Sequence, residues 1–485
     1  MPELRRLHGS AGRLVIVLAV DLGTTATKVV AVDAQARVVA STERGYPMRT
    51  SGAEATHDPF QVLNAALDAL AELASDDVRA VALTGAMHSI MGLDADLRPV
   101  TESLSWADNR AVEQTERLRG TPEGRELHQA TGTPIHSFTP LMKLAWFHEN
   151  GVRAAKWCEI KDFVHLHLTG ELLNEHSCGS GTGLMNIHTL QWHEPSLEFA
   201  GVTADQLPPL VEPTHSTPLK AEIPGLRKGI PVIIGGGDGP LGNLGVGAAT
   251  PGAGAVSLGT SGALRVAQRG PGVDEEGRTF SYAIAEGLWV RGGAISNGGV
   301  VAQWAAETFG IPVGDLLGRA AAVDSDGLVA LPYLLGERAP WWDSTAHAAL
   351  LGLRREHTPQ QITKALVEGV CQQLALVLDA VPNVESLRIT GGAFRAPIWA
   401  QTLANTLGMP LHLTEDSGGS AVGAALVAWR ALDVIPELTV DLVRPIQTIT
   451  PDEDAIRRYA SARPFVAKAY RALEELYSEG TGPRT

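Results

Sequence analysis

The chain has 485 residues, with 39 lysines and arginines against 54 aspartates and glutamates, and therefore a net charge of −15. Its hydrophobic fraction of 44% supplies enough apolar surface for a packed core, which excludes large-scale disorder, and its length fits roughly two to four domains. The acidic balance argues against a nucleic-acid partner, because binding to phosphate backbones needs a basic surface.

Cysteine content and the N-terminal region indicate the compartment. Three cysteines in so long a chain cannot form a disulfide framework, which favours a reducing cytoplasm. The apolar run Leu14–Val20 has only seven residues, whereas a membrane helix needs ~20. It passes into Asp21 without a small-residue cleavage site. We therefore interpret the run as a buried strand after an N-terminal extension (residues 1–13), and we expect no membrane association.

The first half of the chain alternates strand and helix patterns. Apolar β-branched runs at Leu14–Val20 and Lys28–Val32 indicate buried strands, with Asp21-Leu-Gly-Thr-Thr25 as the hairpin between them. Further elements are predicted at Val38–Ser41 (strand), Phe60–Ala74 (helix), Val78–Leu83 (strand) and Pro231–Ile234 (strand). This alternation indicates an α/β domain with a more irregular elaboration at about 95–230.

The sequence then repeats a motif. Ala19-Val-Asp-Leu-Gly-Thr-Thr25 is matched by Ala255-Val-Ser-Leu-Gly-Thr-Ser261 almost half a chain later, and each copy precedes a second strand. This internal repeat predicts two domains of similar topology, residues 14–249 and 250–485. Strands are expected near 288–294, 328–331 and 387–390, and helices near 299–309, 359–380, 397–407, 419–432 and 454–477.

The two hairpins could each bind an anion. We expect Gly23 to adopt a backbone conformation closed to other residues, so that main-chain N–H groups and the hydroxyls of Thr24 and Thr25 cradle a phosphate. Asp21 would be repelled by that phosphate unless a cation such as Mg²⁺ lay between them. The alternative is an ordinary hairpin, but a second copy at 257–261 would let two cradles hold one polyphosphate.

Asp238 is a candidate general base. It lies between Gly237 and Gly239 directly after a predicted strand, where a carboxylate at the sheet end could accept a proton from an attacking hydroxyl. A turn without chemistry is the alternative. The glycine pair in Gly391-Gly-Ala393 follows another strand and precedes a helix, where a flat ligand could lie against the backbone, although a plain turn would look the same.

Candidate polyol-binding residues lie in two segments. Met87-His88 follows a strand, and Trp106-Ala-Asp-Asn-Arg110 offers an apolar plate, the acceptor Asp108 and the fork donor Arg110. Such an arginine could bind a substrate carboxylate in bidentate fashion. Each of these residues could instead be structural. Lys143 and Lys161 remain ambiguous between a helix surface and a site.

Several other reaction classes lack their sequence patterns. The spacings of His165, His167, His176 and Cys178 match neither a zinc-ribbon nor a metalloprotease motif. A G-x-S-x-G elbow, a Walker loop and a full dinucleotide-binding fingerprint are also absent. The sequence therefore argues against zinc enzymes, serine hydrolases, P-loop proteins and Rossmann proteins.

Two further motifs point to a family. Phe138-Thr-Pro140 with Lys143, Trp146 and Glu149-Asn150 forms the first, and Ala348-x-Leu350-x-Gly352-Leu353 with Gln361-Ile362, Ala365 and Val367-Glu368 forms the second. With both hairpins, the chain resembles the FGGY family of carbohydrate kinases over residues 14–470. This resemblance implies an α/β fold of two actin-like ATPase (ribonuclease H-like) domains flanking a central cleft, with sugar bound by the first domain and nucleotide by the second.

The resemblance also implies roles for individual residues. Asp238 corresponds to the catalytic base, Thr24, Thr25, Lys28 and Thr260 to phosphate-binding residues, and Asp21 to a residue near Mg²⁺. Positions lining the nucleotide correspond to Gly299, Gln303, Gly391 and Gly392. Substrate-side positions correspond to Met87, His88, Trp106, Asp108 and Arg110. The expected cofactors are ATP and Mg²⁺.

Within the family, Met87-His88-Ser89, Ser105–Arg110 and Thr131–His136 resemble bacterial gluconokinases, which implies phosphorylation of D-gluconate to 6-phospho-D-gluconate. Xylulokinases or another sugar kinase are the alternative, since they share the Met-His pair. An actin-like or chaperone-like ATPase is a third hypothesis, but the chain ends in a helix and a polar tail with no client-binding module. The expected partner is a small sugar acid, and dimers are frequent among related kinases.

Overall fold

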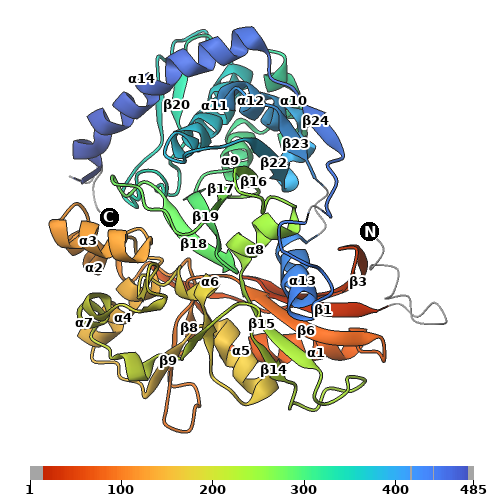
Figure 1. Ribbon diagram of the computed structural model, residues 1–485. Helices are drawn as coiled ribbons and strands as arrows, with labels where there is room; N and C mark the ends of the chain where they lie inside the picture. The colour runs from red at the N-terminus through yellow and green to blue at the C-terminus, as the bar shows by residue number, and fades with distance from the viewer. Residues whose placement is uncertain (1–14, 415–417, 441, 479–485) are drawn as a thin grey trace.

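The computed structural model describes residues 15–414, 418–440 and 442–478, and the predicted extension at 1–13 lies outside them. Two β-sheets form the centres of two halves of the molecule (Figure 1). The first sheet has the order β14 (Ser216–Pro218), β15 (Pro231–Gly237), β6 (Val78–Gly85), β1 (Ile16–Leu22), β2 (Ala26–Asp33) and β3 (Val38–Gly45). The second has the order β18 (Phe280–Ala285), β19 (Leu288–Ile295), β17 (Gly262–Arg269), β16 (Ala253–Leu258), β22 (Ser386–Thr390), β23 (Leu411–Leu413) and β24 (Gln447–Ile449).

The two sheets share one topology. In the first, β1 pairs antiparallel with β2 and parallel with β6; in the second, β16 pairs antiparallel with β17 and parallel with β22. A further antiparallel strand continues each sheet on one side, β3 or β19, and a further parallel strand on the other, β15 or β23. The predicted fold of two similar α/β domains is therefore confirmed.

The helices cover the sheets on both faces. Helices α1 (Pro59–Leu73), α5 (Ile160–Thr169) and α8 (Asp238–Gly245) belong to the first half. Those of the second half are α9 (Val300–Phe309), α10 (Val313–Ala321), α11 (Pro359–Leu378), α12 (Pro397–Leu407), α13 (Gly419–Ala431) and α14 (Glu453–Ser478). Each of the five helices predicted for the second half is present within two residues of its expected ends.

Helix α13 crosses to the other half. It packs on α8 and on β1, β6 and β15 of the first sheet, beside which it lies in Figure 1. Its Trp429 donates a hydrogen bond of 2.9 Å to the carbonyl of Asp33 in β2. A Cβ at Gly245 or Gly423 would lie less than 2 Å from backbone of the facing helix, so the two glycines allow α8 and α13 to approach closely. A boundary at residue 250 thus divides the strands between the sheets but not the helices.

The elaboration of the first half consists of short elements. Its helices are α2 (Val112–Leu118), α3 (Pro122–Thr131), α4 (Pro140–Glu149), α6 (His176–Gly179) and α7 (Glu194–Ala200). Its strands, with those just before it, are β4 (Arg49–Ser51), β5 (Glu54–His57), β7 (Met91–Leu93), β8 (Ser103–Leu104), β9 (Lys156–Cys158), β10 (Asn174–Glu175), β11 (Met185–Asn186), β12 (Gln191–Trp192) and β13 (Leu210–Val211). The second half adds β20 (Val329–Leu331) and β21 (Ala349–Leu351).

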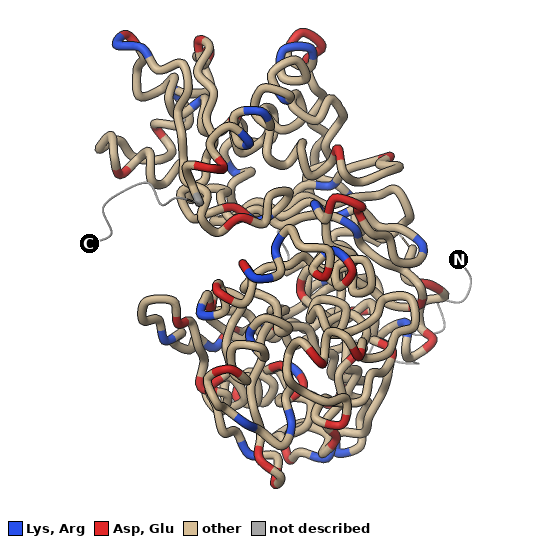
Figure 2. The backbone as a smooth tube through the Cα atoms, turned by 90° about the vertical axis from the view of Figure 1, so that its left-hand side faces the viewer, with Lys and Arg blue, Asp and Glu red and all other residues tan. Residues whose placement is uncertain are grey.

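The distribution of charge, the hydropathy of the helices and the state of the cysteines also bear on the predictions. In the view of Figure 2, basic and acidic residues are interspersed along both halves. No helix among the described residues is long and apolar enough to cross a membrane. The cysteines, Cys158, Cys178 and Cys371, are buried free thiols.

Candidate active site

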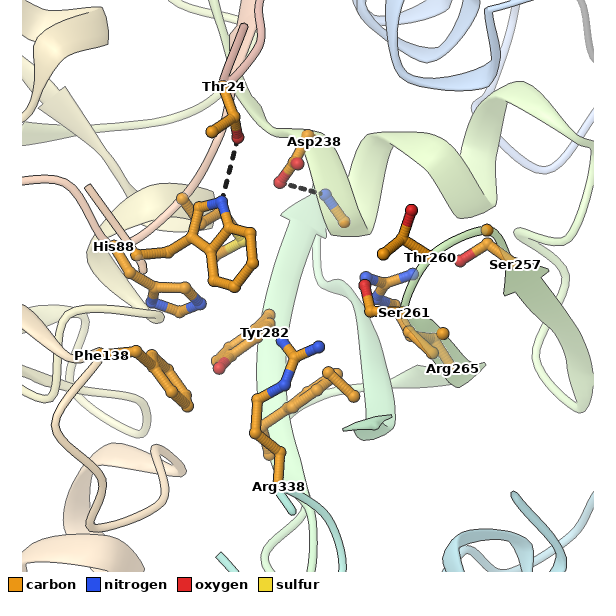
Figure 3. A pocket seen from close by; sticks show the side chains of 18 of the residues that line it. Thr24, His88, Phe138, Asp238, Ser257, Thr260, Ser261, Arg265, Tyr282 and Arg338 are labelled. Atoms are coloured by element: carbon orange, nitrogen blue, oxygen red, sulfur yellow. Dashed lines mark hydrogen bonds between the residues drawn. The ribbon is translucent and has the colours of Figure 1, made fainter. Parts of the chain in front are cut away.

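A cavity of about 380 Å³ lies between the two halves, within the size range of small-molecule sites (Figure 3). Residues of both halves line it: Thr24, Met87, His88, Trp106, Phe138, Asp238, Ser257, Gly259, Thr260, Ser261, Arg265, Phe280, Tyr282, Arg338 and Trp342. A second cavity of about 450 Å³ shares Trp106, Phe138, Thr260, Ser261 and Arg338 with it and is also lined by His136 and Glu337. The two spaces therefore adjoin one another.

The first hairpin brings Thr24 to the cavity. Strand β1 extends through Asp21, which pairs with Lys28 of β2, so the predicted loop is shorter than expected and Asp21 belongs to the strand. Gly23 donates a backbone hydrogen bond of 3.0 Å to Ala26. Its φ lies outside the left-handed region, which corrects our prediction; a Cβ there would instead lie 2.9 Å from the Ala26 carbonyl oxygen. Close approach, and not φ, is the reason for glycine.

The second hairpin, between β16 and β17, exposes Thr260 to the cavity. It is held by the N-terminus of α9, because Gly299 donates to the Gly259 carbonyl at 2.7 Å and Gly298 donates to the Thr260 carbonyl at 3.0 Å. A Cβ at Gly299 would lie 2.9 Å from the carbonyl oxygen of Gly259. The hairpin loop is therefore positioned by backbone contacts, which leaves the Thr260 hydroxyl available to a ligand.

Asp238 is the first residue of α8, at the end of β15. The strand end is fixed because the Gly237 N–H donates to Ser177 Oγ at 3.2 Å. The Asp238 carboxylate accepts from the Gly239 N–H at 2.8 Å and is open to the cavity. Loss of bulk solvent raises its pKa, while nearby Arg265 and the backbone donors lower it. A carboxylate so placed can accept a proton from a group bound in the cavity.

Asp21 lies close to Asp238, as its electrostatics indicate. Burial raises the pKa of Asp21 to about 6; a hydrogen bond from Ser420 opposes this rise, the charge of Asp238 adds to it, and that of Lys28 opposes it. Among the described residues no cluster of three or more histidines, cysteines or carboxylates could hold a metal. Two carboxylates beside the predicted phosphate cradle fit Mg²⁺, which is usually held by one or two carboxylates, water and substrate phosphates.

His88 is held in one tautomer. Its Nδ1 lies 2.9 Å from the carbonyl oxygen of Gly181, so Nδ1 carries the proton and Nε2 is left as an acceptor. Burial and then the charge of Lys143 lower the pKa of His88 to about 3. The ring contacts Phe138 at a centroid distance of 4.5 Å. A neutral imidazole in a cavity wall is suited to accept a hydrogen bond from a hydroxyl group.

Trp106 and Lys143 hold together the part of the cavity wall that the first half contributes. The Trp106 Nε1 donates to Thr24 Oγ1 at 3.0 Å, so the predicted substrate plate contacts the first hairpin directly (Figure 3). Lys143 is fully buried, and its Nζ donates to the carbonyls of His88 at 2.7 Å and Ser105 at 2.6 Å. Lys143 is therefore a positioning residue beneath the cavity. Lys161 is also buried and pairs with Glu175 at 3.1 Å.

The predicted substrate contacts of Asp108 and Arg110 are not supported, because neither side chain lines the cavity. Asp108 is fully buried and accepts from the Ala55 N–H at 3.0 Å and from Arg110 Nη2 at 2.8 Å. Arg110 also donates to Glu54 at 2.9 Å and stacks 4.7 Å from the Trp146 ring centroid. Since two carboxylates already neutralise Arg110, it is not free to receive a third.

The other residues expected at the nucleotide lie outside the cavity lining. Gly391 has a φ of 110°, and a Cβ there would lie 2.5 Å from the carbonyl oxygen of Leu258. Gly392 begins a short 3₁₀ helix, η3 (Gly392–Arg395), and faces open space. The exposed Gln303 donates to Glu307 at 2.8 Å. Thr25 is exposed, and the Lys28 Nζ lies near Gly418.

Our reading of the sequence missed several residues that line the cavity. Arg265 could have been found, because it is the one charged residue in the first six positions of β17. Phe138 belongs to a family motif but was not assigned to the site. Tyr282 and Arg338 carried no local signal, since an alternating strand and an irregular loop do not reveal what they face.

The chain is similar to known proteins over almost its whole length. Residues 16–245 match the N-terminal domain of the FGGY family of carbohydrate kinases, and residues 254–432 match its C-terminal domain. A gluconokinase of Bacillus subtilis is 33% identical over 96% of this chain and 97% of its own. A xylulose kinase of Escherichia coli is 29% identical over 94% of this chain and 99% of its own.

A solved structure shares the fold as well. The crystal structure of a gluconate kinase from Lactobacillus acidophilus superposes with a TM-score of 0.92 at 29% identity, covering 96% of this chain and 99% of the other. Both family domains and the entire two-domain fold are thus matched. The chain belongs to the FGGY family of carbohydrate kinases.

Proposed function

We propose that the protein transfers the γ-phosphoryl group of ATP to the terminal hydroxyl of D-gluconate and forms 6-phospho-D-gluconate. The observation that carries this proposal is the position of Asp238, which opens onto a cavity also lined by Thr24 of the first hairpin and Thr260 of the second. Phosphoryl transfer needs an acceptor hydroxyl, a proton acceptor and a phosphate cradle in one water-poor space. A carboxylate and two hydroxyl side chains that line one cavity support this proposal.

Asp238 acts as the general base. The hydroxyl oxygen forms a bond to the γ-phosphorus, its proton passes to the Asp238 carboxylate, and the bond from the γ-phosphorus to the bridging oxygen breaks as ADP leaves. Arg265 lies beside this carboxylate: a Cβ at Gly239 would be 3.1 Å from its Nε. The guanidinium opposes the rise in the pKa of Asp238. Arg265 therefore helps to keep the base ionised before transfer.

Thr24, Thr25, Lys28 and Thr260 bind the phosphates, and Asp21 is the residue that would hold Mg²⁺. When bound, the cation neutralises charge on the phosphate oxygens that leave and transfer. The Asp21 carboxylate is kept in orientation by Ser420 at 2.5 Å. On the acceptor side, His88 Nε2 accepts from a substrate hydroxyl and Trp106 contacts the carbon chain. Gly299, Gln303, Gly391 and Gly392 surround the nucleotide.

The choice of gluconate rests on the likeness to gluconokinases over 96% of the chain and on the three segments that resemble them. D-xylulose is the second candidate acceptor, because xylulose kinases match nearly the same length. A coupled ADP-release assay with gluconate, xylulose, ribulose and glycerol separates the two. We expect the highest kcat/KM with gluconate. A higher value with xylulose would show that the acceptor is the ketose and not the sugar acid.

A further inference from the structure

Two arginines in the cavity wall lack carboxylate partners. Arg265 and Arg338 both line the cavity, and the Nε atoms of both are buried without a hydrogen-bond acceptor. Among the described residues, neither guanidinium has a carboxylate oxygen within 4.0 Å. Other half-buried arginines are paired: Arg278 contacts Asp274 at 2.8 Å, and Arg110 contacts Asp108 at the same distance. Neither arginine therefore makes a direct ion pair, although the charge of Asp238 acts on Arg265 and that of Glu337 acts on Arg338.

The two arginines face different ends of the cavity. Arg265 lies beside Gly239 and Asp238, at the end where the phosphoryl group is transferred. Arg338 lines both adjoining cavities, and its Cζ lies 5.6 Å from the Trp106 ring centroid. In Figure 3 its guanidinium projects into the cavity beside Tyr282, and Asp238 lies across the cavity from it. Arg338 is thus placed to meet the part of a substrate that is remote from its reacting hydroxyl.

The surroundings of Arg338 hold it in place without a direct ion pair. Its Nη2 donates to the carbonyl of Ile295 at 2.7 Å, which fixes the orientation of the planar group. The carboxylate of neighbouring Glu337 accepts from the Ser296 N–H at 2.6 Å, from Asn297 at 3.1 Å and from the backbone N–H of Arg338 at 2.8 Å, but not from the guanidinium. Among the described residues, the buried atom of Arg338 that lacks a hydrogen-bond partner is Nε. A buried, unsatisfied donor costs about 1–3 kcal/mol, a cost that an anionic ligand would remove.

The neighbouring histidines cannot take over this task. Burial and then the charge of Arg338 itself lower the pKa of His136 to about 3, and His88 is likewise neutral. Lys143 is committed to two backbone carbonyls beneath the cavity. Arg338 is therefore the cation best placed to receive an anion at the acceptor end of the cavity.

We propose that Arg338 binds the carboxylate of the acceptor and makes the enzyme select a sugar acid over the neutral polyol of the same length and stereochemistry. This inference rests on the proposed function and assigns its selectivity to one residue. An arginine suits the task, because its planar fork matches a carboxylate in bidentate fashion. The role that the sequence suggested for Arg110 is thereby transferred to Arg338.

The test compares D-gluconate with D-glucitol, which has a hydroxymethyl group where gluconate has its carboxylate. In Arg338→Gln we expect kcat/KM for gluconate to fall roughly 10- to 100-fold, the usual loss for a charge-assisted hydrogen bond. The value for glucitol and the KM for ATP stay within about twofold. Arg338→Lys keeps the charge without the fork and should recover part of the loss. Arg354→Gln, an exposed arginine paired with Asp326, is the matched control.

Equal losses with both acceptors, or a raised KM for ATP with unchanged selectivity, would overturn the proposal. If Arg338→Gln fails to fold, the wild-type comparison still decides, because an enzyme without preference for the acid over glucitol excludes a carboxylate site. A different result would refute the proposed function without refuting the role of Arg338. A wild type that prefers another aldonate to gluconate, and loses that preference in Arg338→Gln, refutes gluconate but retains the role of Arg338.

Discussion

Ser420 donates a hydrogen bond of 2.5 Å to the carboxylate of Asp21, although the two residues are 399 positions apart in the chain. Ser420 stands in the first turn of α13, which belongs to the second half of the sequence but packs on the first sheet. The same helix contacts α8, whose first residue is Asp238. One helix thus contacts both the carboxylate that we propose to hold Mg²⁺ and the helix that begins with the proposed base.

Removal of this hydrogen bond should weaken the site for the cation. In Ser420→Ala, the Asp21 carboxylate loses the donor that orients it, and partners of this kind typically contribute 10–100-fold in metal affinity. We expect the Mg²⁺ concentration for half-maximal activity to rise by about tenfold or more, with kcat at saturating Mg²⁺ changed much less. A titration of activity against Mg²⁺ measures this. Ser461→Ala, an exposed serine of α14, serves as the control, and overlapping titration curves for all three proteins would contradict the assignment.

Arg110 should contribute to stability and not to selectivity. In Arg110→Gln, the fully buried Asp108 loses its ion-pair partner, which typically costs about 3 kcal/mol or more. We expect a lower Tm and an unchanged ratio of kcat/KM between gluconate and glucitol. Arg98→Gln alters an exposed pair and should change stability by less than about 0.5 kcal/mol. A changed acceptor ratio in Arg110→Gln at normal Tm would restore the role predicted from sequence.

Lys143 should make stability depend on pH. Burial lowers its pKa from 10.5 to about 7, so between these values the unfolded chain binds a proton that the native protein lacks. Stability relative to Lys143→Met should therefore increase with pH across this window, by about 1.4 kcal/mol per unit, and be independent of pH below it. Denaturation curves at pH 6, 7, 8 and 9 measure the difference.

The matched control for this pH series is Lys228→Met, which alters an exposed lysine paired with Glu222. Its stability should follow that of the wild type in parallel at every pH. If Lys143→Met also runs parallel to the wild type between pH 7 and 9, Lys143 keeps an ordinary pKa. The buried amine would then be charged in the native protein.

The fold was largely predictable because the central strands β1 and β15 are mostly apolar. Runs such as Pro231–Ile234 and the two copies of the Leu-Gly-Thr motif identify buried strands and the repeat without tertiary information. The end of β1 was placed too early, since a ladder tolerates a polar residue such as Asp21 when Lys28 lies opposite. The sheet on which α13 packs could not be predicted either. Residues Ala421 to Trp429 are all buried, so their pattern identifies a helix but not the sheet that it covers.

The site was predictable where local motifs build it. Thr24, Thr260 and Asp238 lie at strand ends with glycines beside them, and the structure brings all three to one cavity. Arg338 was not predictable, because it occupies an irregular loop and meets Trp106 only through the packing of the two halves. The role predicted for Arg110 was not supported for the same reason. Its guanidinium could bind a substrate carboxylate, but in the fold it already pairs with Asp108 and Glu54.

The most direct test of the central claim is steady-state ADP release with D-gluconate by Asp238→Asn, with ATP affinity measured in parallel. The substitution keeps the shape of the side chain but removes the proton acceptor, so we expect kcat to fall by roughly 10²–10⁴-fold while ATP binds as in the wild type. Asp326→Asn, on the surface of the second half, should retain full activity. Turnover of Asp238→Asn within a few-fold of the wild type would contradict the account, because the transfer would then proceed without the base on which it depends.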